Sequence, residues 1–434
     1  MFEKLEKSVT PIVAKIQGNT VIRSISEGFS SYVGLLIVGS VFLLIACFPI
    51  DAVANFFAGI VIGNNTLAGL FSKVSTVTFS ILGVYCVLGI ARSYAKNRGV
   101  EPYSAMLTSF AAWLYLMPGL DAGIPFDWIG AKGVFLGMLS TLLVVEIMKF
   151  VVDRGWVIKL PDGVPPAVSE SFTAMIPMAV VFVIYIVIEA IVTACGTDMF
   201  TLIYTIIAAP LQGLTTSYGG YMVAEFMIHF LWWFGIHGSN VVGAITGPFL
   251  QMAAAQNIAY FQTGVGEPSI ICQQFGDLFC TLGGCGSTLS LLIVVLLVCK
   301  SKRLRTIAEL ALPAGIFQIN EPVTFGFPMA LNPALAIPFF LVPLVNVTVA
   351  YFSMKLGLVA IPSGVAVAWT CPPIIAGFLC CGWTGAVLNA VQLVLGMVIY
   401  APFIKMYDKK LLEEEANQST ATADADVDLD SITL

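Results

Sequence analysis

Long apolar runs alternate with short polar segments along most of the chain. A helix needs about 20 apolar residues to cross the roughly 30 Å hydrocarbon core of a membrane. The chain contains ten such apolar runs, which predict ten membrane-spanning helices. Some of the runs are shorter than 20 residues because polar residues end them. The predicted spans are residues 28–50, 74–91, 102–120, 133–150, 171–197, 221–234, 241–254, 278–299, 332–354 and 383–404.

The charged residues between these spans predict the orientation of the chain. Lysine and arginine gather at residues 4–23, 92–98, 149–159, 300–305 and 405–410. Basic loops stay on the cytoplasmic side, so these clusters are expected inside and the surroundings of Asp51, Asp121 and Asp198 outside. Ten spans satisfy every assignment and place both termini in the cytoplasm. The first cluster precedes any apolar run, so no cleavable signal peptide is predicted.

Three segments do not fit clean spans. Residues 310–331 and 359–382 are apolar, but several prolines and glycines interrupt them. Irregular backbone at membrane depth lines a cavity or is covered by protein, so both segments are expected to be re-entrant. Residues 153–166 mix charged side chains with Trp156 and Ile158, which is typical of an amphipathic element at the membrane surface.

The distribution of these features divides the chain. Residues 1–200 hold five clean spans and predict a scaffold, whereas residues 201–410 hold the broken segments and predict the half that carries the site. Residues 411–434 contain seven acidic residues, no lysine or arginine and no aromatic residue. Such a composition buries little surface, so this tail is expected to be disordered.

Composition supports an all-α integral membrane protein. Hydrophobic residues make up 58% of the 434 residues and charged residues only 11%, against about 25% in soluble proteins. Soluble enzymes and nucleic-acid-binding proteins are therefore excluded. The net charge of −6 comes from the tail, since the rest of the chain has 20 basic and 19 acidic residues. The ten cysteines form no Cys-x-x-Cys pair and lie mostly in apolar runs, so they are expected to be reduced packing residues.

Glu321 is the most conspicuous polar residue. Between Leu310 and Ile404 the only charged residues are Glu321 and Lys355. A carboxylate at membrane depth costs about 2.5–3.5 kcal/mol, so it usually faces a cavity or a partner. We interpret Glu321 as a functional acid, with Asn320 and Gln318 near it as neutral donors and acceptors. The structural alternative is a carboxylate at a helix terminus, bound to a backbone N–H group.

His237 is the second candidate. Gly235 and Gly238 lie close to it on both sides and remove side-chain bulk, so the imidazole is expected to be exposed. His229, by contrast, follows Glu225 by one helical turn and is interpreted as a satisfied core residue. Two histidines and scattered cysteines give no metal-ligand spacing, so neither a metal nor another cofactor is expected.

Two further features have open interpretations. Gly276, Gly283, Gly284 and Gly286 lack the following Gly-Lys-Ser/Thr of a phosphate loop, so close helix packing is favoured over approach to a ligand. Trp369 lies in a broken segment, where its indole suits stacking on a sugar ring or anchoring at the membrane interface equally well.

Two glutamates interrupt predicted spans in the first half, Glu146 and Glu189. Both are interpreted as structurally paired, Glu146 with Lys149 three residues later.

Three motifs resemble one family of membrane proteins. They are Phe-Gly-Ile-His-Gly at 234–238, Gly-Ile-Phe-Gln-Ile-Asn-Glu-Pro at 315–322 and Trp-Val-Ile-Lys-Leu-Pro-Asp at 156–162. They resemble the IIC subunits of the bacterial phosphotransferase system, in the lactose/cellobiose branch that includes the diacetylchitobiose permeases. The resemblance covers nearly the whole chain. It implies a homodimer in the bacterial inner membrane, with an interface domain of five spans and a substrate domain of five spans plus two re-entrant hairpins.

The resemblance also implies residue roles and partners. Glu321 and His237 would lie near the sugar hydroxyl that receives phosphate, and Trp232, Asn320 and Trp369 would line the sugar site. The phosphate donor in this family is a IIB domain with a phosphocysteine, supplied in turn by IIA. No such soluble module is recognisable in this sequence, so IIB is expected to be a separate protein and this chain to have no phosphotransferase activity alone.

Two other classes of function remain. An ion-coupled sugar transporter would use His237 and Glu321 as a proton relay. A membrane-embedded hydrolase would need a carboxylate pair or a metal cluster, which the sequence does not offer. Within the first class, cellobiose, diacetylchitobiose and lactose remain open as the sugar.

Overall fold

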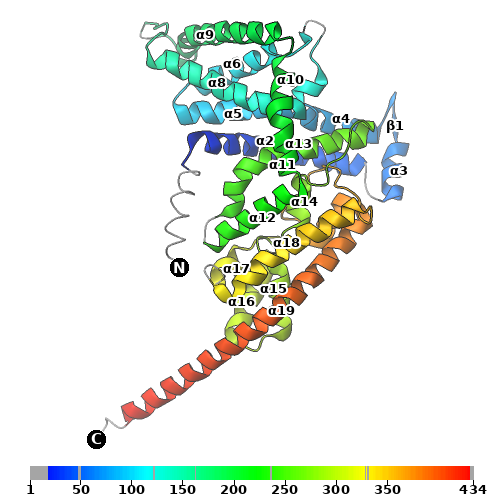
Figure 1. The fold of residues 1–434 in the computed structure, drawn as a ribbon, viewed down its shortest axis with the longest axis vertical. Coiled ribbons are helices and arrows are strands. Elements are labelled where there is room, and N and C mark those ends of the chain that lie inside the picture. Colours follow the sequence, from blue (N-terminus) through cyan, green and yellow to red (C-terminus); the bar gives the residue numbers. More distant parts are fainter. Residues whose placement is uncertain are drawn as a thin grey trace. The chain divides into compact units, whose positions relative to one another are not determined.

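The structure is a computed structural model, and the chain it describes is mostly helical (Figure 1). It describes residues 18–46, 50–120, 123–161, 163–234, 237–327, 329 and 332–430. The chain forms two compact units. Unit 1 comprises Met1–Ala224, Ser239–Gln274 and Ile361–Val367, and unit 2 comprises Glu225–Gly238, Phe275–Ala360 and Ala368–Leu434. The sequence predicted a different division, at residue 200, between an interface domain and a substrate domain. That functional division stays a prediction.

Unit 1 consists of helices and one short hairpin, in which β1 and β2 pair antiparallel. The elements up to the first boundary are α2 (Thr20–Ala46), α3 (Asp51–Gly59), β1 (Val61–Ile62), β2 (Asn65–Thr66), α4 (Leu67–Phe79), α5 (Leu82–Arg98), α6 (Pro102–Tyr115), α7 (Phe126–Ile129), η2 (Ala131–Gly133), α8 (Val134–Asp153), α9 (Pro166–Ala194), α10 (Met199–Ile203), η3 (Tyr204–Ala208) and α11 (Ala209–Thr215). The chain returns to unit 1 in α13 (Gly238–Thr263).

Unit 2 is built from the later helices. Helices α12 (Tyr218–Trp233) and α14 (Gln273–Phe279) each have residues in both units. The others are α15 (Thr288–Val298), α16 (Lys302–Ile316), α17 (Glu321–Gly326), α18 (Pro333–Lys355) and α19 (Pro373–Asp430). The long helices α18 and α19, yellow and orange in Figure 1, run side by side.

Local capping fixes where several helices begin. The first turn of a helix has backbone N–H groups without intrahelical partners. At α6 the Glu101 carboxylate accepts hydrogen bonds from the backbone N–H groups of Tyr103 (2.8 Å) and Ser104 (2.6 Å). At α10 the Asp198 carboxylate accepts one from the N–H of Thr201 at 2.8 Å. Short polar residues next to the apolar runs therefore start these helices.

Small residues bring α2 and α5 into close contact in unit 1, where Figure 1 shows them side by side. A Cβ on Gly28 would lie 2.7 Å from the Cα of Ile90, and one on Gly89 would lie 2.6 Å from the carbonyl oxygen of Gly28. Real side chains do not tolerate such distances. The two backbones therefore approach as closely as they do because both positions are glycine.

The two glutamates inside predicted spans both have partners, and most of the described cysteines are buried. Glu146 forms an ion pair with Arg98 of α5, with Oε1 and Nε 2.7 Å apart, rather than with the predicted Lys149. Glu189 accepts a hydrogen bond from the Thr193 hydroxyl at 3.4 Å. Among the nine cysteines that the structure describes, none forms a disulfide and seven are buried.

The fold class predicted from the sequence is confirmed. Within the described residues, five helices are long and apolar enough to cross a membrane, or up to seven if each of two bent helix pairs is one span. Each of the ten predicted spans overlaps a helix, although α6, with 14 residues, and α15, with 11, are shorter than a complete span. The count of ten spans therefore stays a prediction.

One predicted span is wrong as a continuous helix. Residues 278–299 were expected to form a single span, but α14 ends at Phe279 and α15 begins only at Thr288. Between them Gly283, Gly284 and Gly286 have φ angles of 81–88°, and Ser287 has a φ of 52°. These left-handed conformations cannot continue a right-handed helix. We call residues 280–287 the glycine loop.

The two segments predicted to be re-entrant are indeed broken. Residues 317–320 are not helical and separate α16 from α17, and residues 356–372 contain no helix before α19 begins. Turns and extended chain also occupy the described part of residues 154–165, between α8 and α9. The depth of these segments in the membrane stays a prediction.

The C-terminal tail begins within a helix that packs in unit 2, and the disorder expected of its acidic end stays a prediction. Helix α19 continues to Asp430, through the helix-forming run Leu411-Leu412-Glu413-Glu414-Glu415. Leu411 is buried and belongs to the hydrophobic core of unit 2. The part of the tail that lacks core contacts therefore starts later than residue 411.

Candidate functional site

His237 lies between α12 and α13, where it contacts Trp232. The ring centroids are 4.5 Å apart, with the planes tilted by 46°. The imidazole is exposed, whereas Trp232 is only 3% exposed and packs in the core of unit 2. The structure thus brings together two predicted site residues, of which Trp232 is mainly a core residue. The predicted contact of Trp232 with the sugar stays a prediction.

Glu321 is the first residue of α17, and Pro322 follows it within the first turn. Proline suits this position because its missing N–H group would have no intrahelical partner. The Glu321 side chain lies outside the described residues. A position at the start of a helix also fits the structural alternative for this carboxylate, so the backbone alone does not separate the two interpretations.

Asn320 is buried immediately before α17. Its side-chain Nδ2 donates a hydrogen bond to the Thr324 hydroxyl at 2.9 Å. The backbone of Gly284, in the glycine loop, lies directly against it, because a Cβ on Gly284 would come within 2.7 Å of both Cβ and Oδ1 of Asn320. The loop therefore packs against the segment that leads into Glu321.

Trp369 lies in the irregular segment before α19, and its side chain is 56% exposed. A turn encloses it, since the Cys371 N–H donates a hydrogen bond to the carbonyl of Ala368 at 2.8 Å. An exposed indole on a short turn suits both predicted roles, stacking on a sugar and anchoring at an interface. Its role stays a prediction.

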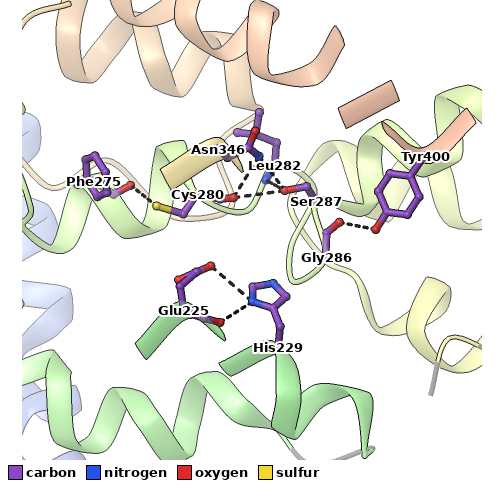
Figure 2. A network of polar contacts seen from close by, with 9 residues as sticks. All are labelled: Glu225, His229, Phe275, Cys280, Leu282, Gly286, Ser287, Asn346 and Tyr400. Carbon is purple, nitrogen blue, oxygen red and sulfur yellow. Dashed lines mark hydrogen bonds and ion pairs between the residues drawn. The ribbon is translucent and has the colours of Figure 1, made fainter. Parts of the chain in front are cut away.

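Buried hydroxyl and amide groups hold the glycine loop in place, as Figure 2 shows. The Cys280 carbonyl accepts hydrogen bonds from Asn346 Nδ2 (3.2 Å) and Ser287 Oγ (3.3 Å), and the Tyr400 hydroxyl donates to the carbonyl of Gly286 (2.6 Å). Gln392 Nε2 donates to the carbonyl of Phe279 at 2.7 Å. Helices α18 and α19 thus supply partners that the non-helical backbone would otherwise lack.

His229 and Glu225 form the buried pair that the sequence predicted. Nδ1 of His229 lies 2.8 Å from the Glu225 carbonyl oxygen and 3.7 Å from its carboxylate Oε1 (Figure 2). The imidazole packs edge-on against Phe339 of α18, with ring centroids 5.4 Å apart. Its interpretation as a core residue is confirmed.

The site also contains three residues that the sequence did not single out, Asn346, Asn389 and Gln392, which are completely buried. Gln318, which the sequence offered as a neutral donor and acceptor near Glu321, is nearly so. A single neutral amide in an apolar run also bonds between packed helices, so its presence alone does not indicate a site. Among the residues that the structure describes, no three His, Cys, Asp or Glu side chains lie together as a metal site would require.

The fold and the motifs define a multi-span helical membrane transporter. The family model described as phosphotransferase system, EIIC, matches residues 26–343. The chain belongs to this family of sugar permeases, and the ion-coupled alternative gains no support. EIIC components work with IIB partners.

Several relatives are similar over nearly their whole length. The lichenan permease IIC component of Bacillus subtilis (strain 168) is 38% identical, covering 95% of this chain and 94% of the relative. The cellobiose-specific EIIC component of Geobacillus stearothermophilus is 37% identical, covering 96% and 97%. The crystal structure of ChbC, the IIC component of the N,N'-diacetylchitobiose-specific system, superposes with a TM-score of 0.88 at 35% identity, covering 95% of this chain and 99% of ChbC.

Proposed function

We propose that this permease takes up a β-linked disaccharide and presents it for phosphorylation by a separate IIB protein. Support for the substrate comes from relatives at 35–38% identity that are named for cellobiose, lichenan and diacetylchitobiose. Lactose-specific relatives are more distant, as in the 29% identical EIICB component of Streptococcus mutans. The chain covers 75% of that relative, which combines the C and B components in one protein.

The observation that carries this proposal is the grouping of the polar site residues in unit 2. His237 against Trp232, Asn320 against the glycine loop, the start of α17 at Glu321 and the exposed Trp369 all belong to this unit. Aromatic faces stack on the apolar face of a sugar, and amide groups bind its hydroxyls. Glu321 would accept the proton of the hydroxyl that attacks the phosphate, with His237 as a second polar contact.

Phosphorylation then makes uptake irreversible. A phosphate group adds about two negative charges at neutral pH. A doubly charged sugar cannot recross the hydrocarbon core, so release into the cytoplasm is favoured. We propose that the permease lies in the bacterial inner membrane as a homodimer, with both termini and the IIB-facing side in the cytoplasm.

The test is sugar uptake in cells that lack their own β-glucoside permeases. Labelled cellobiose, diacetylchitobiose and lactose are supplied to cells that express this chain with or without a cellobiose-type IIB protein. We expect phosphorylated cellobiose or diacetylchitobiose to accumulate only when IIB and phosphoenolpyruvate are present. Uptake of free sugar that follows an imposed pH gradient without IIB would contradict the proposal and restore the proton-relay alternative.

A further inference from the structure

Gln318 has an unusual backbone conformation for a side chain of its size. Its φ angle is 67°, a left-handed value that it shares, among the described non-glycine residues, only with Ser287. Left-handed backbone is unfavourable for residues with a Cβ, so it persists where surrounding contacts enforce it. Gln318 is also only 4% exposed, which means that its amide needs buried partners.

The Gln318 amide joins two segments of unit 2 that are far apart in sequence. Its Oε1 accepts a hydrogen bond from the backbone N–H of Gly283, in the glycine loop, at 2.9 Å. Its Nε2 donates to the carbonyl oxygen of Cys371 at 3.3 Å. Cys371 closes the turn that carries Trp369. One side chain therefore bridges the glycine loop and the Trp369 turn.

The backbone of Gln318 contacts the same loop. A Cβ on Gly284 would lie 2.8 Å from the Gln318 carbonyl oxygen, as well as 2.7 Å from the Asn320 side chain. Residues 318–320 therefore lie flush against the loop, and only a glycine fits at position 284. The glycine loop thus holds the segment that leads into Glu321, and through Gln318 it also holds the turn that carries Trp369.

The glycine loop is itself fixed by hydrogen bonds from two helices. Helices α18 and α19 bind the carbonyls of the loop and its entrance through the completely buried side chains of Asn346 and Tyr400 (Figure 2) and of Gln392. Asn346 and Gln392 also bind each other, since Gln392 Nε2 donates to the Asn346 carbonyl at 3.0 Å. A glycine loop whose carbonyls are hydrogen-bonded in this way is rigid, so residues 318–320, which pack against it, are held in place as well.

We propose that Gln318 is a positioning residue of the sugar site, which sets the placement of the Trp369 turn relative to the Asn320–Glu321 segment. The inference rests on the proposed function, in which these residues contact the sugar. Gln318 acts through its two hydrogen bonds and need not touch the substrate. Loss of the bond to Cys371 frees the Trp369 turn, so the stacking surface no longer holds its place relative to the hydrogen-bonding groups.

The test separates positioning from folding by a double-mutant cycle. In Gln318→Glu the side chain can still accept from the Gly283 N–H, but an ionised carboxylate cannot donate to the Cys371 carbonyl. Gln318→Ala removes both bonds. Purified wild-type protein and variants, each alone and combined with Trp369→Ala, are assayed for binding of labelled cellobiose and diacetylchitobiose and for thermal unfolding. Phosphorylation by IIB is measured at saturating and at limiting sugar.

We expect each Gln318 variant to weaken binding by roughly tenfold and to do so mainly when Trp369 is present, since coupled neighbours are not additive. The loss in phosphorylation should be larger at limiting than at saturating sugar. The matched control is Gln212→Leu, because Gln212 of unit 1 is another buried amide, bound to Gln256 at 2.7 Å. This control should lower the melting temperature without changing sugar affinity.

Three results would overturn the inference. One is wild-type affinity in both Gln318 variants, and another is a loss of equal size with and without Trp369. The third is a failure of both Gln318 variants to fold while Gln212→Leu folds, because Gln318 would then serve stability alone. Absence of sugar binding in the wild type is distinguishable from all three, since it would remove the proposed function itself.

Discussion

The contact between Trp232 and His237 joins a buried ring to an exposed one. The indole is held by the core of unit 2, so it cannot turn without disturbing its neighbours. The imidazole that packs on it takes part of its orientation from this contact. Aromatic packing thereby limits the directions in which the His237 nitrogens can point.

Replacement of Glu321 by glutamine tests the role of its charge. The amide keeps the shape of the side chain but cannot accept a proton from a sugar hydroxyl, so phosphorylation should fall by roughly 10²-fold or more while measurable binding remains. Glu309→Gln, an exposed glutamate on α16, is the matched control. Formation of labelled sugar phosphate by purified protein and IIB gives the rate. A near wild-type rate would show that Glu321 does not carry the chemistry and would favour His237.

Replacement of Trp369 by alanine tests the stacking role. The indole is mostly exposed, so its removal should weaken sugar binding at least severalfold while the melting temperature changes little. Trp383→Ala is the control, because Trp383 is an exposed tryptophan of the same unit and should leave affinity unchanged. Unchanged affinity together with a collapsed melting temperature would assign Trp369 a structural role.

Sequence alone could identify the residues that are unusual in a membrane-spanning segment. Glu321 is conspicuous because charges are rare between Leu310 and Ile404, and His237 because glycines lie close on both sides. Gln318 was noted only as a neutral donor and acceptor near Glu321, and Asn346 was not predicted, since only three-dimensional contacts show what an uncharged amide binds. The hydrogen bonds that fix a site are thus less visible in sequence than its charges.

At the scale of elements, left-handed backbone breaks the predicted span between α14 and α15, whereas missing donors do not always break a helix, since Pro177 lies inside α9 and Pro338 inside α18. Periodicity and apolar length placed a helix under every predicted span, yet they missed the break between α14 and α15. Glycine is common in membrane helices, so the cluster at 283–286 was ambiguous in sequence. The left-handed φ of Ser287, a residue without a strong preference for it, was not predictable at all.

The cap of α6 gives a prediction at this scale. Burial raises the pKa of Glu101, but hydrogen bonds from Ser104 and Tyr103 outweigh it, and the pKa is lowered overall. A lowered folded-state pKa means that the carboxylate stabilises the fold above its unfolded pKa, and that this stability is lost as pH falls through the folded value. Glu101→Ala should cost about 1 kcal/mol near neutral pH, as other N-cap losses do.

Thermal unfolding in detergent from pH 7 down to pH 3 measures this effect. The difference in melting temperature between wild type and Glu101→Ala should shrink as the medium becomes acidic. An exposed acid outside any cap, Glu267, provides the control as Glu267→Ala. A constant difference across this range would contradict the assigned cap.

At the scale of the whole molecule, neither unit is a continuous piece of chain. Unit 1 takes Ser239–Gln274 and Ile361–Val367 from the second half, and side chains from both returns enter its core with Phe249, Met252 and Val365. A cut at any single boundary therefore leaves a unit without part of its interior. The two units have to be made as one chain or reassembled from fragments.

The acidic tail should be dispensable for transport. Leu411 packs in the core of unit 2, so the cut belongs after Glu413, which is exposed. Removal of residues 414–434 takes away acidic chain of low hydrophobicity, and we expect uptake and melting temperature to stay near wild type. A truncated protein that inserts normally but loses uptake by about tenfold would show that the tail has a role in function, such as docking of IIB.

The amides that hold the glycine loop impose an order on biosynthesis. The Cys280 carbonyl has Ser287 as a partner 7 residues later and Asn346 as a second one 66 residues later, whereas the Gly286 carbonyl binds Tyr400, 114 residues later. At about 5–20 residues per second, the ribosome delivers Tyr400 roughly 6–23 s after Gly286. Until then the Gly286 carbonyl needs water or the insertion machinery as a partner, because lipid offers none. A nascent chain stalled before α19 emerges would keep this loop hydrated, and its sugar site would be completed among the last parts of the protein.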